Sequence, residues 1–543
     1  MAQNLVEYKR FAGLNTRDSV HRIWESSHAS AALNVDVGLD FVETTPGYDL
    51  FNEDTSKTGG IKYIMPYYGA NGTTKQLMFM HDDDVYYLDI SAAVATDAAW
   101  QTVGDYGTAT NNPSMIVYDD TVIIGGGGTN ELKKWTGSAF TAVTNQPVAS
   151  NGINIFEIYE GRDFKSVFGV KEGTNTVYYP VPGSPDDWTG ATSGNLVIGK
   201  NDGDGVWGLK AQGQYMWVIK ERRKYPVEIV YDTAGLAYLP DVGQRTDSSG
   251  GTIAANSCQV VTRRDFSDDI HMLTRQDGIS SFGRPSGFND ALVSYSVSEL
   301  INNLLYTNIN WSYKDKARAV AWERKYMCAV PFLAAQSNSG VIVEHLDSND
   351  FTIYDHINVG CYAKVKLSDG LEYLLVGDAD EPKIYKFNKD RYDVDNNGYT
   401  RKYRTGKITF DGLYNIKDGL QWIDISGAIK IGTTLYVKLI SDSVEKIFAI
   451  NSDQLLEDTS GGYIGDHVIG TEFIGGTSTS SSKFRFVAHI DMSNLQREFR
   501  SLQVEFYNSG VGEYWKIDRL AFDFEDQRTN LPRNSQYILE PIT

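Results

Sequence analysis

The chain has 543 residues, of which 41% are hydrophobic and 22% are charged, so it has the composition of a globular protein of about two to four domains rather than of a disordered chain. Its 50 basic and 70 acidic residues give a net charge of −20, which argues against nucleic acid or an anionic membrane as the main partner. Three scattered cysteines without a CxxC pair exclude a disulfide framework and a cysteine zinc site.

Residues 1–49 form the first predicted segment, an N-terminal arm followed by an entry strand. The segment lacks the apolar stretch of a signal peptide, and no run in the chain reaches the roughly 18–20 apolar residues of a membrane span, so we expect no membrane partner. Its apolar anchors are too few to form a core alone, and we expect the arm to contact a neighbouring subunit through them. These anchors are Leu14, Val20, Ile23 and Trp24.

Residues 50–390 show a repeated pattern of short β-rich runs separated by turns such as Asn71-Gly72 and Asp369-Gly370, which favour hairpins. The leading runs begin near Ile61, Ser114, Ile155, Val206, Ser257, Ala317 and Tyr362. A repeat of about 40–50 residues with three or four strands each predicts a β-propeller of about seven blades. A stack of β-sandwiches is the alternative.

One helix interrupts the strands, over residues 294–306. Its apolar residues recur at helical spacing, and Ser296 with Glu299 matches the Ser-x-x-Glu capping box. We expect it to lie between two blades, on one face of the propeller.

A polar, turn-rich stretch from Lys389 to Thr400 ends the repeat. About seven β-rich runs follow within residues 400–526, a number and length typical of a β-sandwich. Residues 527–543 have no periodicity and are predicted to be an extended C-terminal arm. The predicted fold class is therefore all-β.

The strongest ligand motif lies in the polar stretch. Asp393, Asp395 and Asn397 supply oxygen atoms at alternate positions ahead of Gly398, as in the opening of a calcium loop. The twelfth position, which should carry a bidentate acid, is Arg404. A calcium site and a polar turn both stay open, and no other cofactor is predicted.

No catalytic constellation stands out. The eight histidines form no HExxH motif, and no GxSxG motif is present, so we predict no enzymatic activity. Propellers include glycosidases, however, and the many acidic residues keep a carbohydrate-active protein open. Some of the basic residues Lys220, Arg222, Arg223 and Lys224 are expected to point outward from the blades and to pair with acids of a neighbouring subunit rather than to bind DNA tightly.

The N-terminus resembles a family of tailed-bacteriophage virion proteins. The residues that carry the resemblance are Gly13, Leu14, Asn15, Thr16, Ala31, Asn34, Val35, Asp36, Pro46, Gly47 and Tyr48. The predicted layout, a propeller followed by a sandwich, is similar to tail hub or nozzle proteins of short-tailed phages.

The resemblance implies a structural role in the virion tail: a homo-oligomeric ring around the DNA exit channel, next to other tail or portal-proximal proteins. Such a subunit would be assembled in the host cytoplasm and would carry no catalytic residues. Two alternatives stay open, a carbohydrate-active or receptor-binding propeller at the tail tip and a soluble bacterial propeller that binds other proteins.

Overall fold

The computed structural model divides the chain into two compact bodies. The propeller body comprises Asp49–Leu346 and Ile357–Phe387, and the sandwich body comprises Met1–Tyr48, Asp347–His356 and Asn388–Thr543. The structure describes residues 3–8, 10–23, 26–107, 112–146, 151–161, 164–233, 237–243, 250–264, 267–283, 293–409, 420–441, 445–452, 483–491 and 501–525.

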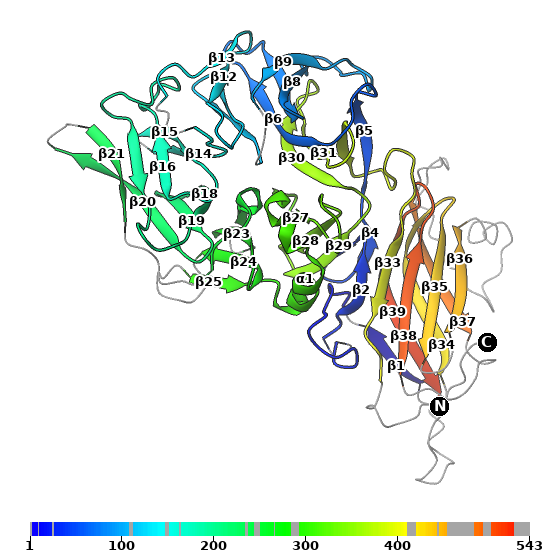
Figure 1. The fold of residues 1–543 in the computed structure, drawn as a ribbon. Coiled ribbons are helices and arrows are strands. Elements are labelled where there is room, and N and C mark those ends of the chain that lie inside the picture. The colour runs from blue at the N-terminus through cyan, green and yellow to red at the C-terminus, as the bar shows by residue number, and fades with distance from the viewer. Residues whose placement is uncertain are drawn as a thin grey trace. The chain divides into compact units, whose positions relative to one another are not determined.

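The propeller body consists of antiparallel sheets arranged around a ring (Figure 1). The first three blades are β6 (Ile61–Tyr68), β7 (Lys75–His81), β8 (Asp84–Asp89) and β9 (Gln101–Asp105); β10 (Ser114–Tyr118), β11 (Thr121–Gly125), β12 (Lys133–Trp135) and β13 (Phe140–Ala142); and β14 (Ile155–Glu160), β15 (Lys165–Val170), β16 (Thr176–Tyr179) and β17 (Gly194–Val197). The next two are β18 (Val206–Gln212), β19 (Tyr215–Lys220), β20 (Lys224–Asp232) and β21 (Ala237–Val242); and β22 (Gln259–Thr262), β23 (Asp268–Thr274), β24 (Gly278–Gly283) and β25 (Val293–Ser296).

The last two blades complete the ring. The sixth contributes β26 (Arg318–Trp322), β27 (Lys325–Val330) and β28 (Gly340–His345) to this body, and the seventh is β30 (Val359–Lys366), β31 (Glu372–Asp378), β32 (Lys383–Asn388) and β5 (Gly47–Glu53). The innermost strands contact one another in the cycle β6, β10, β14, β18, β22, β26, β30 and back to β6. The predicted seven-bladed propeller is therefore confirmed, and each innermost strand begins within three residues of its predicted start.

The ring closes because β5, which precedes the first blade in the chain, is the outer strand of the seventh. Its Asn52 is fully buried and accepts a 2.7 Å hydrogen bond from the indole Nε1 of Trp100, while its amide nitrogen donates to the carbonyls of Ala95 and Ala98. Phe51 packs in the core shared by the first and seventh blades. A strand from the beginning of the propeller thus joins its two ends.

The helix predicted over 294–306 is only partly present. Residues 293–296 form β25, the outer strand of the fifth blade, and helical structure begins at the 3-10 helix η3 (Glu299–Ile301) and continues through α1 (Asn302–Asn308). Ser296 forms no capping box, because its hydroxyl donates to the Asp277 carbonyl. Residues 293–296 fit both a strand and the start of the predicted helix. They form a strand because they pair with β24 in the sheet of the fifth blade. Two further 3-10 turns are η2 (Ala255–Ser257) and η4 (Trp311–Lys316).

The sandwich body is built of two sheets. One has the order β3 (Val35–Val37), β4 (Val42–Thr44), β39 (Trp515–Glu525), β34 (Leu420–Lys430) and β37 (Lys483–Asp491), with β1 (Gln3–Tyr8) also paired to β39. The other has β29 (Asp350–Tyr354), β2 (Ala29–Leu33), β33 (Arg401–Thr405), β38 (Leu502–Asn508), β35 (Thr434–Ser441) and β36 (Glu445–Asn451). Trp515 and Phe506, both fully buried, bring the two sheets together with ring centroids 6.3 Å apart.

The predicted N-terminal arm is wrong as a separate element. Residues of the segment form β1, β2, β3 and β4, and each of these strands pairs within the sandwich body. The physical reason is that its apolar residues complete the core of the C-terminal strands instead of forming one alone. The C-terminal arm predicted over 527–543 lies outside the described residues. Among the residues that are described, no helix has the length and apolar character that a membrane crossing requires.

We predict that Asn52→Ala lowers the free energy of unfolding of the propeller by about 2–4 kcal/mol, because it leaves the buried Trp100 indole N–H without its acceptor and removes two hydrogen bonds to the carbonyls of Ala95 and Ala98. Chemical denaturation followed by tryptophan fluorescence measures the change. Asn303→Ala, at an exposed helix position, is the matched control and should change stability by less than about 0.5 kcal/mol. An equal effect of the two variants would show that Asn52 does not close the ring.

Candidate interaction surfaces

The N-terminal segment is held in the sandwich body by backbone hydrogen bonds. Leu14 N donates to the Phe351 carbonyl at 2.7 Å, and Ala29 N donates to the Gly13 carbonyl at 2.9 Å. A Cβ atom at Gly13 would lie 2.5 Å from both the nitrogen and the oxygen of Phe351. Only glycine allows this approach.

Asn15 shapes the loop that follows. Its Oδ1 accepts hydrogen bonds from the backbone N–H groups of Arg17 and Asp18, at 3.1 and 3.0 Å, and its Nδ2 donates to the Asp18 carboxylate at 3.0 Å. The hydrogen bond from Asn15 and the pairing with Arg17 hold the pKa of Asp18 below its usual range. Asn15 therefore specifies a turn within this chain.

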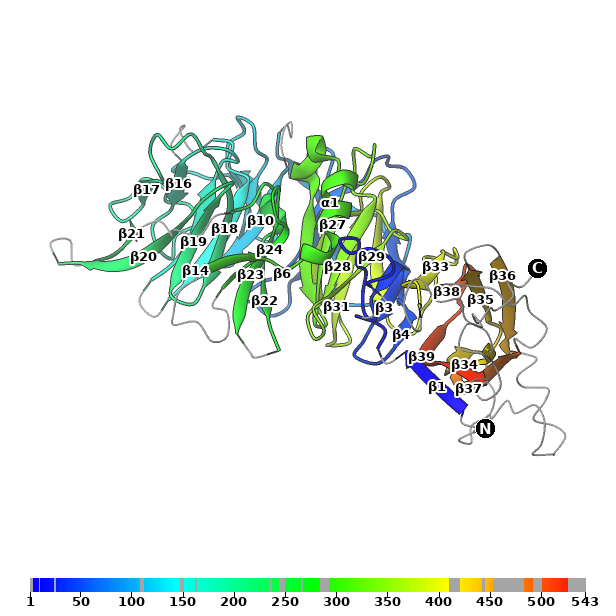
Figure 2. The same cartoon turned by 90° about the horizontal axis from the view of Figure 1, so that it is seen from below.

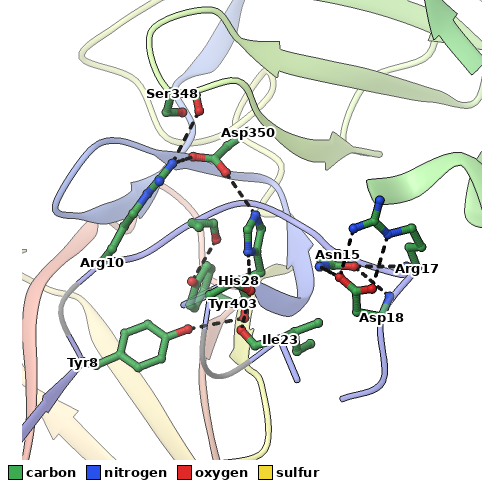
Figure 3. Close-up of polar contacts among 12 residues, drawn as sticks. Tyr8, Arg10, Asn15, Arg17, Asp18, Ile23, His28, Ser348, Asp350 and Tyr403 are labelled. Carbon is green, nitrogen blue, oxygen red and sulfur yellow. Dashed lines mark hydrogen bonds and ion pairs between the residues drawn. The ribbon is translucent and has the colours of Figure 1, made fainter. Parts of the chain in front are cut away.

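A charged cluster lies beside this loop. Asp350, buried at the start of β29, pairs with the Arg10 guanidinium at 2.6 Å and lies 3.7 Å from the Nε2 of His28. Burial lowers the pKa of His28. The Tyr403 hydroxyl donates to the Ala12 carbonyl at 3.0 Å. The N-terminal segment is therefore bound both to Asp350 of β29 and to Tyr403 of β33 (Figure 3).

Asn34 is the second centre of the motif. It has a left-handed backbone, with φ of 51°, and its amide Nδ2 donates to the Asp355 carboxylate and the Thr400 carbonyl. Its Oδ1 accepts from Asp355 N and from the Nδ1 of His356, both at 2.8 Å. Asparagine tolerates this conformation and supplies donors and acceptors at once.

His356 is buried among aromatic rings and has no charge partner at Nε2. Its ring stacks on Tyr399 at 4.3 Å and lies 5.7 and 5.5 Å from the rings of Tyr48 and Tyr354. Burial, with the nearby Arg401 cation, lowers the pKa of His356 to about 3, while Asp36 acts weakly in the other direction. The imidazole is therefore neutral in the folded chain.

The four residues predicted as an interface separate into two kinds. Leu14 and Ile23 are buried within this chain, with 5% and 1% exposed, so neither is available to a neighbour in this conformation. Val20 is 38% exposed, so its side chain is accessible to a neighbouring subunit. Trp24 lies outside the described residues. Their spacing in the sequence gave no sign of this difference, because the Phe351 carbonyl that binds Leu14 N comes from far along the chain.

The proposed calcium ligands are placed in a tight turn. The Asp393 carboxylate is buried and accepts from the Nε of Arg391 at 2.6 Å and from Asn396 N at 2.9 Å, while Asn397 Nδ2 donates to the Asp395 carbonyl. Asp395 and Asn396 have positive φ angles, as turn residues do. Within the described part of the chain, no three His, Cys, Asp or Glu side chains are grouped as a metal site requires, and these contacts favour the polar-turn alternative.

The basic cluster of the propeller body is engaged internally. Lys220 is fully buried and its Nζ lies 2.8 Å from both carboxylate oxygens of Asp202, which Arg223 also approaches to 3.5 Å. Lys224 is buried against the Gly250 carbonyl, and burial lowers its pKa to about 8. The expected outward pairing with acids of a neighbouring subunit is wrong for Lys220 and Lys224, because both side chains are buried and the acid partner of Lys220, Asp202, lies in the same chain.

An exposed apolar surface occurs on the β20–β21 hairpin, which projects from the propeller body (Figure 2). Val230, Tyr231 and Tyr238 are 41%, 48% and 39% exposed, and the two tyrosine rings pack on each other with centroids 4.9 Å apart. Tyr231 and Tyr238 are directly opposite in the antiparallel register. Sequence reasoning missed this surface, because the length of the hairpin beyond the blade is not visible in the alternation of its residues.

Comparison with protein-family models gives no match, and no curated protein matches the chain. Among solved structures, the chain is similar to BBS1N in its complex with ARL6DN (9% identity, 66% of this chain and 98% of that chain, TM-score 0.36). It is also similar to the Neurospora crassa Pan2 WD40 domain (10%, 61% and 89%, TM-score 0.32). A third is the β-propeller domain of Cps50 (Swd1) from Myceliophteria thermophila (9%, 63% and 99%, TM-score 0.36). At this identity the likeness concerns the fold alone.

We predict that the sandwich body loses stability as the pH falls from about 6.5 towards 3. The folded pKa of His356 lies below its unfolded value, so the unfolded chain binds the extra proton in this window. Thermal unfolding of wild type and His356→Gln between pH 7 and 4 isolates this group. The wild type should lose up to about 3 kcal/mol more than the variant. Parallel pH profiles of the two proteins would contradict this account of His356.

We also predict that Gly13→Ala destabilises the sandwich body by about 2–3 kcal/mol, because the added methyl group meets the Phe351 backbone. Gly69→Ala is the control, since its Cβ would lie 3.0 Å from the Thr74 side chain and not against backbone. Denaturant unfolding of both variants gives the comparison. If Gly13→Ala unfolds at the wild-type midpoint, the close approach does not constrain the segment.

Proposed function

We propose that this chain is a non-catalytic structural subunit of a tailed-bacteriophage virion, of the tail hub or nozzle type, which assembles as a ring of identical copies around the DNA exit channel. The N-terminal motif supports the virion assignment. Its residues Gly13, Asn15 and Asn34 each hold a specific backbone contact in the sandwich body, so the resemblance extends to residues with a defined structural use.

The observation that carries the proposal is the exposed aromatic pair on the β20–β21 hairpin. Water-exposed tyrosines on one face of a hairpin are typical of protein interaction surfaces, where aromatic rings bury much area at little cost in side-chain entropy. Tyr231 and Tyr238 already fix each other's position. A hairpin that projects from a rigid blade is suited to reach a neighbouring copy.

The charge distribution supports a passive contact with DNA. A net charge of −20 gives a surface that repels phosphates, and Lys220 and Lys224, which the sequence placed in a basic cluster, are buried in internal contacts. Duplex DNA carries one phosphate charge per about 1.7 Å and is surrounded by counterions. Tight binding requires basic side chains that neutralise these phosphates and so release the counterions. An acidic channel wall would let the genome pass without being held.

A second function is favoured by the same aromatic pair, since exposed tyrosines also stack on sugar rings. In that case the chain would be a receptor-binding propeller at the tail tip. The two functions differ in the partner that the hairpin binds, so one pair of substitutions tests both.

The test uses Tyr231→Ser with Tyr238→Ser, because both side chains are exposed and their loss should not unfold the propeller. We expect a monomer with the wild-type melting temperature that no longer forms rings in analytical ultracentrifugation and is absent from particles. Tyr306→Ser, at a 67% exposed position on α1, is the matched control and should assemble normally. Rings of the double variant that equal those of wild type would refute the assembly role, and loss of binding to host polysaccharide alone would favour the receptor function.

A further inference from the structure

A cavity of about 230 Å³ lies in the propeller body beside the first residues of four innermost strands, β6, β10, β26 and β30. Asn112, just before β10, donates to the Asp315 carbonyl at 2.6 Å and so joins two blades that are not neighbours in the ring. The cavity therefore lies at the end of the ring where these strands begin. Its volume corresponds to roughly seven or eight water molecules.

Three cationic side chains line this cavity: Lys62, Lys316 and Arg318. Lys62 donates to the Asp82 carbonyl at 2.6 Å, and Lys316 lies 3.9 Å from the carboxylate of the adjacent Asp315. An ammonium group has three donors, so both lysines keep donors for a ligand.

Arg318 is the most unusual of the three, because it is only 6% exposed. Its Nη1 donates to the carbonyls of Asp315 and Ala317, both at 3.2 Å, and its Nε is buried without a partner. Among the described residues, no carboxylate lies within ion-pair distance of this guanidinium and its Nη2 makes no hydrogen bond. A buried cation without a counter-charge is costly, and the Nε–Nη2 edge is the fork that binds a carboxylate through two parallel hydrogen bonds.

The opposite wall presents an acceptor. Asn338 is 2% exposed, and its Nδ2 donates to the carbonyls of Lys316 and Val359, both at 2.8 Å, which fixes the orientation of the amide. Asn338 lines the cavity, and its Oδ1 is buried without a hydrogen-bond partner among the described residues. A ligand that binds both residues carries an anionic acceptor for the Arg318 guanidinium and a hydrogen-bond donor for the Asn338 Oδ1.

Acidic groups also lie around the cavity, and the Asp315 carboxylate, 3.9 Å from the Lys316 ammonium, offsets part of its positive charge. The Asp82 side chain lies on the rim and is 70% exposed to solvent. Glu172 lies near Arg318 outside ion-pair distance, and burial raises the pKa of its carboxyl, so it holds its negative charge less firmly.

We propose that this cavity binds a small carboxylate that also carries hydroxyl or amino donors. The Nε–Nη2 edge of Arg318 pairs with the carboxylate, Lys62 and Lys316 add positive charge at the mouth, and the Asn338 Oδ1 accepts from a hydroxyl or amino group. The site is distinct from the hairpin surface proposed for assembly, so either proposal can fail without the other.

The test measures binding of four probes to the full chain by isothermal titration calorimetry: glucuronate, glucose, propionate and inorganic phosphate. We expect glucuronate to bind with a Kd on the order of 1 mM, at least about tenfold more tightly than glucose or propionate, since each lacks one of the two required groups. Phosphate binding as tight as that of glucuronate would overturn the carboxylate assignment. Absence of saturable glucuronate binding would overturn the site.

Variants locate the binding. Arg318→Met should weaken glucuronate binding at least about tenfold, whereas Lys364→Met, an exposed position on β30 that does not line the cavity, should leave it unchanged. If Arg318→Met fails to fold, as judged by circular dichroism, the double variant Lys62→Met with Lys316→Met decides instead, because both side chains are partly exposed. Wild-type affinity in the folded Arg318 variant, or in the double variant, would refute the proposal.

Discussion

Ring closure is the constraint on which the propeller depends. Seven sheets arranged around an axis leave the first and last blades facing each other, and without a link these blades would separate whenever either frayed. Here β5 supplies the link, because it enters the seventh blade before the chain begins the first. The hydrogen bonds of Asn52 to Trp100, Ala95 and Ala98 then tie that strand to the first blade. Closure also removes open sheet edges around the axis, which a protein present in many copies must protect.

The same N-terminal segment serves the sandwich body first. It pairs as β1 through β4 and then continues directly into the closing strand of the propeller. The shared motif therefore makes physical sense as a set of folding requirements: Gly13 allows a close backbone approach, Asn34 holds a left-handed turn, and Gly47 leaves no room for a side chain against the Asp393 carbonyl. One continuous segment therefore contributes strands to both bodies.

Much of the fold could be predicted from the sequence, because blade strands are local. Runs such as Ile61–Tyr68 pair with the next run across a short turn, so their period is visible in the residues. The pairing of β5 with β32 and of β1 with β39 could not be predicted, since these partners lie hundreds of residues apart and their residues carry no pairing signal.

The candidate sites were less predictable than the fold. Asp393 and Asp395 looked like ligands because the motif records residue types, whereas the Arg391 ion pair and the positive φ angles belong to the turn itself. Arg318 attracted no notice in the sequence, since one arginine at the start of a strand is ordinary. Its importance arises from burial without an ion-pair partner, which only the arrangement of four blades produces.

The central claim is that β5 closes the propeller, and native-state hydrogen exchange tests it most directly. Backbone amides that are protected only by local structure exchange when that structure opens locally. Amides in a closed ring exchange only when the whole body unfolds, so their protection reports its global stability. We expect the amides of β5 that pair with β32 to exchange as slowly as those of the central strand β31. Exchange of β5 at rates typical of exposed loops, while β31 stays protected, would contradict the account.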